Sequence, residues 1–76
     1  MPSRPPECRL FGLSVRKYRK VRGLSQESLA LKAEIHRTYI GGIERGERNP
    51  TLTMIHKIAR ALKVSPLQLL GNSASK

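Results

Sequence analysis

Apolar side chains recur every three or four residues along most of the chain, the spacing that gathers them on one face of an α-helix. Phe11, Val15 and Tyr18 form the first such stripe and predict a helix over residues 10–21. A clearer stripe follows Thr51 and predicts another helix; its members are Leu52, Ile55, Ile58, Ala59 and Leu62. No segment alternates with the two-residue period of a strand. The pattern therefore predicts an all-α fold.

Capping signals predict two short helices in the middle of the chain. Gly23 ends the first helix, and Ser25 can cap a second helix over residues 26–33. His36 stands in a cap-like position before a third helix over residues 37–45. Only three residues separate the second and third helices, so we expect them to cross steeply. That arrangement is a helix-turn-helix.

Both ends of the chain are expected to lie outside the folded domain. Residues 1–9 contain three prolines and no periodic pattern, so we expect a flexible arm that does not join a helix. A capping box at its start and Gly71 at its end limit a fifth helix to residues 66–70. Residues 72–76 contain no apolar side chain able to anchor them and are expected to be disordered. The folded domain is thus predicted to span residues 10–71.

The charge balance indicates a polyanionic partner. Fifteen Lys and Arg residues against five acidic ones give a net charge of +10, which speeds encounter with nucleic acid or anionic lipid. Cys8 is the single cysteine, so no intrachain disulfide can form and a reducing compartment is expected. No apolar run has the length of a secretory signal or a membrane span. We expect a cytoplasmic protein.

The helix predicted over residues 37–45 has one polar face suited to reading DNA. Burial of Ile40 and Ile43 places almost no hydrocarbon on the opposite side of this helix. Arg37 and Thr38 lie at its N-terminal end, where recognition helices carry their base-reading side chains. Arg pairs with guanine, and Thr can contact a base edge or the thymine methyl group. Arg37 and Thr38 are therefore predicted to read bases.

Gly41 and Gly42 lie on the same predicted polar face. Two glycines inside a short helix cost about 1 kcal/mol each relative to Ala, which calls for a compensating role. One explanation is close approach of the helix backbone to DNA, and the other is packing against a neighbouring segment. Under the first explanation, Gly41 and Gly42 belong to the base-reading set.

Further polar side chains around this helix are predicted to bind the DNA backbone. The positive end of the second helix attracts phosphate, and basic residues follow in the turn after the third helix. Tyr39 either stacks on sugar and phosphate or covers the flank of the second helix. The predicted backbone contacts are Ser25, Gln26, Tyr39, Arg45, Arg48 and Asn49.

Glu44 is an acidic residue near the end of the predicted DNA-facing helix, where it would repel phosphate unless it turned inward. We expect an ion pair between Glu44 and Arg19 of the first helix. Such a pair would orient the third helix and, being partly buried, would add little net stability.

Three segments of the chain together resemble the phage-repressor-like (Cro/C1, XRE) helix-turn-helix family. They are residues 23–30 (GLSQESLA), 36–40 (HRTYI) and 42–51 (GIERGERNPT). Within that family, the RTYI and GIER runs resemble the controller proteins of restriction–modification systems, which carry Ser where this chain has Gly41. The resemblance implies a five-helix, repressor-like domain in which helices 2 and 3 form the helix-turn-helix. It also implies a homodimer that regulates transcription, including that of its own gene, from a pseudo-palindromic operator. The same resemblance implies a protein of a bacterium or phage that associates with the nucleoid through DNA.

The resemblance places the dimer contact on the fourth and fifth helices. A chain of 76 residues has a small core, so an interface would add needed stability. The candidates are Leu52, Ile55, Leu67, Leu69 and Leu70, some of which must fill the core instead. A two-fold dimer would place its recognition helices about 34 Å apart and read half-sites about 10 base pairs apart.

Other functions fit the sequence less well. An enzyme is disfavoured because no catalytic constellation occurs, and we expect no cofactor. Cys8, His36 and His56 lack metal-site spacing, so no metal is expected. Membrane binding would need the apolar stripe of the first helix, and RNA binding would need clustered aromatic residues. An antitoxin of a toxin–antitoxin operon is the main alternative, because such proteins use the same DNA-binding fold.

Overall fold

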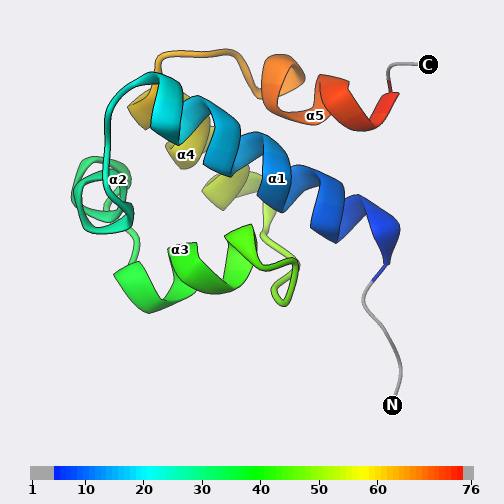
Figure 1. The fold of residues 1–76 in the computed structure, drawn as a ribbon, viewed down its shortest axis with the longest axis horizontal. Coiled ribbons are helices and arrows are strands. Elements are labelled where there is room, and N and C mark those ends of the chain that lie inside the picture. Colours follow the sequence, from blue (N-terminus) through cyan, green and yellow to red (C-terminus); the bar gives the residue numbers. More distant parts are fainter. Residues whose placement is uncertain (1–4, 75–76) are drawn as a thin grey trace.

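The fold consists of five helices in the computed structural model, which describes residues 5–74, with side chains from Pro5 to Gly71. The helices are α1 (Pro6–Val21), α2 (Gln26–Ala33), α3 (Arg37–Glu44), α4 (Leu52–Leu62) and α5 (Pro66–Ala74). Residues 5–74 contain no strand. The prediction of a five-helix, all-α domain with α2 and α3 as a helix-turn-helix is confirmed (Figure 1).

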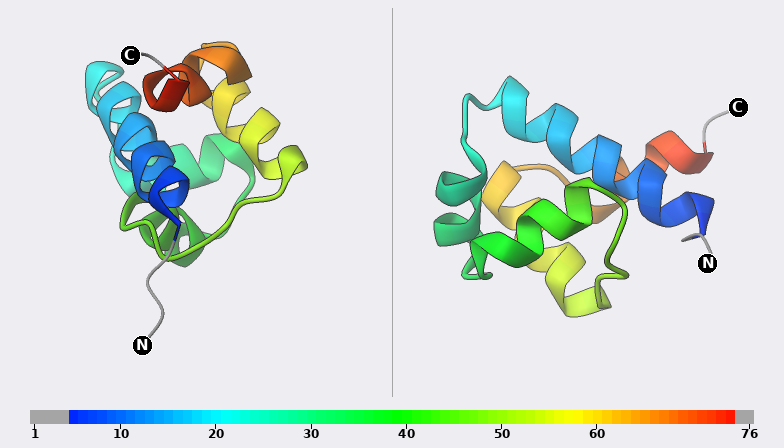
Figure 2. Two further views of the ribbon diagram at one scale, coloured as in Figure 1. Left: turned by 90° about the vertical axis from the view of Figure 1, so that its right-hand side faces the viewer. Right: turned by 60° about the horizontal axis from the view of Figure 1, so that its bottom comes forward.

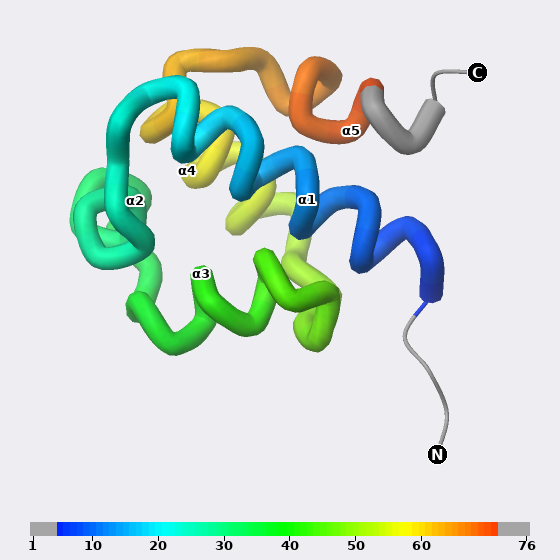
Figure 3. The backbone as a smooth tube through the Cα atoms, viewed as in Figure 1, coloured from blue at the N-terminus to red at the C-terminus, as the bar shows by residue number. Residues whose placement is uncertain are grey.

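Helix α1 runs through the middle of the molecule and packs against α5 on one side and α3 on the other (Figure 1 and Figure 3). Helix α2 contacts α3 and α4. The side chains between these helices form one core, whose fully buried members are Val15, Leu29, Ile40, Ile43, Ile58, Leu62 and Leu69. Helix α3 lies along one edge of the molecule beside α2 (Figure 2).

The predicted caps are present in the structure. The side-chain oxygens of Ser25 and Thr51 each accept a hydrogen bond from the backbone N–H three residues later, at 3.0 and 3.2 Å. His36 Nδ1 accepts the backbone N–H two residues later, at 3.2 Å. Ser65 and Gln68 form the reciprocal capping box, at 3.1 and 2.8 Å. These polar caps fix where α2, α3, α4 and α5 begin.

Helix α1 begins earlier than the apolar pattern predicts. Its first residue is Pro6 rather than Leu10, so the prediction of a flexible arm over residues 1–9 is wrong from Pro6 onward. Proline is compatible with the first helical position because the N–H group it lacks has no partner there. Cys8, two residues further on, is buried. Residues 1–4 lie outside the described part of the chain.

Helix α5 continues past the predicted stop. It includes Gly71 and reaches Ala74, so the prediction that the helix ends at residue 70 is wrong. The domain limit at residue 71 and the disordered tail stay predictions. Gly71 does not adopt the left-handed conformation with which a glycine ends a helix, as Gly23 does with a φ of 71°. Residues 75–76 of the predicted tail lie outside the described part.

The structure divides the apolar residues of α4 and α5 between core and surface. Leu69 is 1% exposed and fills the core, so its prediction as an interface residue is wrong. Ile55 is half-buried and packs on the core. Leu52 and Leu67 are 69% and 78% exposed, and Leu70 is also exposed. Leu52 and Leu67 thus remain available for an interface, and Leu70 stays a candidate by its exposure.

Helices α1 and α3 meet at Gly12, a contact that apolar periodicity did not reveal. A Cβ atom at Gly12 would overlap the backbone oxygen of Ile43 and lie 2.8 Å from that of Glu44. Real Cβ atoms essentially never approach backbone this closely. Backbone-to-backbone contact therefore sets the separation of the two helices at this point.

Candidate nucleic-acid interface

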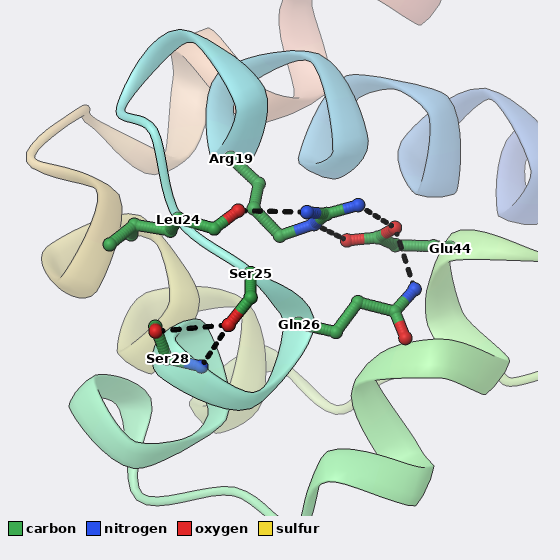
Figure 4. Close-up of polar contacts among 6 residues, drawn as sticks. All are labelled: Arg19, Leu24, Ser25, Gln26, Ser28 and Glu44. Carbon is green, nitrogen blue, oxygen red and sulfur yellow. Dashed lines mark hydrogen bonds and ion pairs between the residues drawn. The ribbon is translucent and has the colours of Figure 1, made fainter.

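The inner side of α3 is anchored by the ion pair expected between Arg19 and Glu44. Arg19 Nε and Nη2 donate hydrogen bonds to Glu44 Oε2 and Oε1 at 2.6 and 3.0 Å, and Nη1 donates to the backbone oxygen of Leu24 at 2.8 Å (Figure 4). The side chains of Arg19 and Glu44 are only 11% and 3% exposed. This bidentate pair joins the end of α1 to the end of α3, and the third bond fixes the start of the turn before α2.

Gln26 joins the same network. Its Nε2 donates a hydrogen bond to Glu44 Oε1 at 3.0 Å, so the first residue of α2 is tied to the last residue of α3 (Figure 4). The sequence pattern predicted a contact of Gln26 with the DNA backbone and gave no sign of this bond. Helices α1, α2 and α3 therefore converge on one carboxylate.

The two predicted base-reading side chains stand at the exposed start of α3. Arg37 Nη1 lies 3.0 Å from Glu27 Oε2 of α2, and the two side chains are 66% and 70% exposed. Thr38 is also exposed, and its backbone N–H is bonded to His36. No signal in the sequence singled out Glu27, because ten residues and a turn separate it from Arg37.

Gly41 and Gly42 are buried, contrary to the expectation that they form a bare face. A Cβ atom at Gly41 would lie 3.1 Å from Arg45 Nη1, and one at Gly42 would lie 2.7 Å from Arg48 Cγ. The glycines are therefore covered by the flexible side chains of two predicted DNA contacts. Both explanations for the glycines keep a structural basis. The glycines pack against the two arginine side chains in this structure, and movement of these arginines would expose the helix backbone to DNA.

The remaining predicted contacts surround this surface. Arg48 stacks over the ring of Tyr39, with 5.2 Å between its guanidinium carbon and the ring centroid. Arg45 Nε pairs with Glu47 at 3.1 Å, and Asn49 is exposed. Ser25 is occupied as the cap of α2 and bonds Ser28 (Figure 4). We call the set Gln26, Arg37, Thr38, Tyr39, Arg45 and Arg48 the recognition surface.

The described part of the chain contains neither a metal-ion cluster nor a membrane-spanning helix. Its His, Cys, Asp and Glu side chains form no group of three or more that could hold a metal ion. Among the described residues, no helix is both long and apolar enough to cross a membrane.

The helix pair α2–α3 and the basic recognition surface define a DNA-binding transcriptional regulator of the helix-turn-helix class. A model of the helix-turn-helix family HTH_3 matches residues 15–69, and the chain belongs to this family. The match covers the turn, the whole recognition surface and the core residues from Val15 to Leu69.

Among curated relatives, the chain is similar to two control proteins. It is 52% identical over 62 residues to control protein C.BamHI of Bacillus amyloliquefaciens, covering 80% of this chain and 76% of that one. It is 48% identical over 63 residues to control protein C.SmaI of Serratia marcescens, covering 83% and 75%. The crystal structure of the restriction-modification controller protein C.AhdI from Aeromonas hydrophila superposes with a TM-score of 0.83 at 43% identity, covering 86% of this chain and 98% of that one. The resemblance to controller proteins is thus confirmed.

Proposed function

We propose that this transcriptional regulator acts as a restriction–modification controller, binding a pseudo-palindromic operator as a homodimer and regulating its own gene. The observation that carries the proposal is the geometry of α3. Its inner end is fixed by the buried Arg19–Glu44–Gln26 network, while Arg37 and Thr38 stand exposed at its start. A rigid helix with exposed hydrogen-bonding side chains at its N-terminal end suits insertion into a major groove.

The recognition surface divides this task between base and backbone contacts. Arg37 and Thr38 would contact base edges, and Arg45 and Arg48 would swing from Gly41 and Gly42 onto flanking phosphates. Gln26, Ser25, Tyr39 and Asn49 would complete the backbone contacts. Movement of the two arginines would also let the glycine backbone approach the groove.

The homodimer is proposed to form through α4 and α5. Leu52 and Leu67 expose most of their apolar surface there. A two-fold axis between two such faces would set the recognition helices about 34 Å apart, one turn of duplex DNA.

The comparisons do not support the antitoxin alternative, because the relatives described above are control proteins. We further propose that the protein works in the cytoplasm without enzymatic activity, cofactor or metal. The charge of +10 supports DNA as its partner.

Base reading is tested by titrating the protein against its own upstream DNA and a scrambled duplex over a salt series. We expect a preference of about 10³-fold for the upstream DNA and steep salt dependence on both duplexes. Arg37→Ala should lower upstream affinity about 5- to 150-fold per half-site, the range for one bidentate base contact. Arg16→Ala, which removes an equal charge from the exposed side of α1, is the control and should keep the preference. Equal binding of both duplexes by the wild-type protein would contradict operator recognition.

The dimer is tested by sedimentation of the variant Leu52→Lys/Leu67→Lys. We expect monomers, since like charges would face each other across the two-fold interface. Leu31→Lys alters an exposed leucine of α2 and should leave the dimer intact. A dimer that survives the double substitution would place the interface elsewhere.

A further inference from the structure

Glu27 is an acidic residue at the edge of the recognition surface, and the proposed function gives it no role. It lies in the first turn of α2 and is largely exposed. Its carboxylate faces Arg37, the main predicted base-reading side chain, with 3.0 Å between Oε2 and Nη1. A carboxylate at this place repels DNA phosphate, so its presence on a DNA-binding surface requires an explanation.

The geometry of the pair leaves most of the Arg37 guanidinium available. An arginine carries five N–H donors in a planar fork, and the bond to Glu27 involves Nη1 alone. The Nε and Nη2 edge remains able to form the bidentate pair with guanine O6 and N7. Glu27 can therefore stay bound to Arg37 while Arg37 reads a base.

The same carboxylate acts differently when the DNA offers no matching base. Arg37 would then gain most by turning onto a phosphate, as arginines do in non-specific complexes. That movement must break the bond to Glu27 and bring phosphate near a negative charge. Glu27 thus disfavours phosphate binding by Arg37 and leaves base binding undisturbed.

We infer that Glu27 is a positioning residue that determines specificity: it holds Arg37 for base edges and lowers affinity for DNA of other sequence. The inference deepens the proposed function and rests on it. Under this inference, Glu27 increases the preference for the operator by weakening the complex with DNA of other sequence.

The test compares Glu27→Gln with Glu34→Gln on two duplexes, the best-bound duplex selected from a randomised library and a scrambled one. Glu34 is the exposed C-cap residue that follows α2 and forms no ion pair with the described residues, so its variant controls for the lost negative charge. Thermal melting first establishes that both variants are folded. Affinity is then measured over a salt series.

Release of Arg37 gives a defined result on the scrambled duplex. Glu27→Gln should add one phosphate contact and steepen the slope of log affinity against log salt by about 0.9, whereas Glu34→Gln should not. The preference for the selected duplex should fall about 1.4- to 5-fold more in Glu27→Gln than in Glu34→Gln, the range of an exposed ion pair. In an Arg37→Ala background, both effects of Glu27→Gln should disappear.

Three outcomes separate this inference from the proposed function. Equal behaviour of the two Gln variants, or an effect of Glu27→Gln that persists without Arg37, would overturn the inference. Failure of the wild-type protein to enrich any sequence would overturn sequence-specific binding itself. If the slope still steepened in Glu27→Gln in that case, restraint of Arg37 by Glu27 would be supported although the proposed function had failed.

Discussion

The inner and outer faces of helix α3 carry the same chemical groups and use them in opposite ways. On the inner face, Glu44 receives two bonds from Arg19 and is nearly excluded from water. On the outer face, Arg37 makes one bond to Glu27, and both side chains are two-thirds exposed. Breaking the first pair leaves a buried charge, whereas water readily replaces the second. Burial therefore decides which pair fixes the helix and which can change partner.

The glycines of the two faces differ in the same way. On the inner face, Gly12 of α1 meets the backbone of Ile43 and Glu44, which cannot move without moving α3. On the outer face, Gly42 meets the aliphatic part of the Arg48 side chain, which can change its conformation without moving α3. A rigid inner face and an adjustable outer face together suit a helix that must hold its position while its side chains search for a ligand.

The largest expected effect comes from breaking the inner pair. Glu44→Ala should lower the free energy of unfolding by about 3–5 kcal/mol, because it leaves the Arg19 charge buried without a partner. A loss of that size would remove most of the stability of a chain this small. Glu27→Ala, the matched change on the outer face, should cost less than about 1 kcal/mol. Urea unfolding measures both, and similar costs for the two variants would contradict the comparison.

Removing both charges of the inner pair tests whether the pair stabilises the fold or only positions α3 against α1. Replacing both members with apolar side chains, Arg19→Met with Glu44→Leu, should restore most of the stability that Glu44→Ala loses, since no charge then remains buried. DNA affinity should stay reduced in the double variant, because Gln26 loses its partner on α3. A double variant as unstable as Glu44→Ala would show that the ion pair itself stabilises the fold.

The glycine contrast gives effects of intermediate size that should differ in magnitude. Gly12→Ala should destabilise the protein by about 1–3 kcal/mol, because the new Cβ atom overlaps backbone. Gly42→Ala should change stability by less than about 1 kcal/mol, since Ala favours the helix but Arg48 must move its Cγ atom and its place over the Tyr39 ring. Thermal melting distinguishes the two, and DNA titration of Gly42→Ala then reports whether backbone approach matters. Destabilisation of equal size by both variants would place Gly42 among the rigid contacts.

The smallest expected effect concerns screening by salt. Between 0.1 and 1 M salt the Debye length falls from about 10 to about 3 Å, which weakens interactions between exposed charges. The small stability difference between wild-type protein and Glu27→Gln should therefore vanish at 1 M salt. The larger difference for Glu44→Gln should persist, because water and ions do not reach that pair. Equal salt sensitivity would mean that both pairs are solvated in solution.

The helix boundaries follow closely from local sequence wherever a polar cap marks them. Ser25, Thr51 and the Ser65–Gln68 box satisfy backbone groups of their own helix, so neighbouring residues suffice to predict them. The prolines before α1 and Gly71 in α5 led to wrong predictions of where these two helices begin and end. Both residue types are compatible with a helix at particular positions, and tertiary packing decides whether the helix continues.

The recognition surface was predictable as a set of residues but not as a set of contacts. Helical periodicity gave the faces on which Arg37 and Glu44 lie, and charge repulsion gave the Arg19–Glu44 pair. The bonds of Gln26 to Glu44 and of Glu27 to Arg37 depend on how α2 crosses α3. Similarly, the assignment of Leu69 to the core depends on where α5 docks on the other helices. Contacts between residues this far apart in the sequence leave no periodic or local signal from which they could be predicted.

The glycine contact between α1 and α3 has a practical consequence for protein engineering. Because backbone rather than side-chain volume spaces these helices at Gly12, substitutions on the outer face of α3 do not alter that spacing. The recognition surface can therefore be diversified in a library while the position of α3 against α1 stays the same. Variants selected for new DNA sequences would then differ in the side chains that contact the groove, while α3 would keep the same position in all of them.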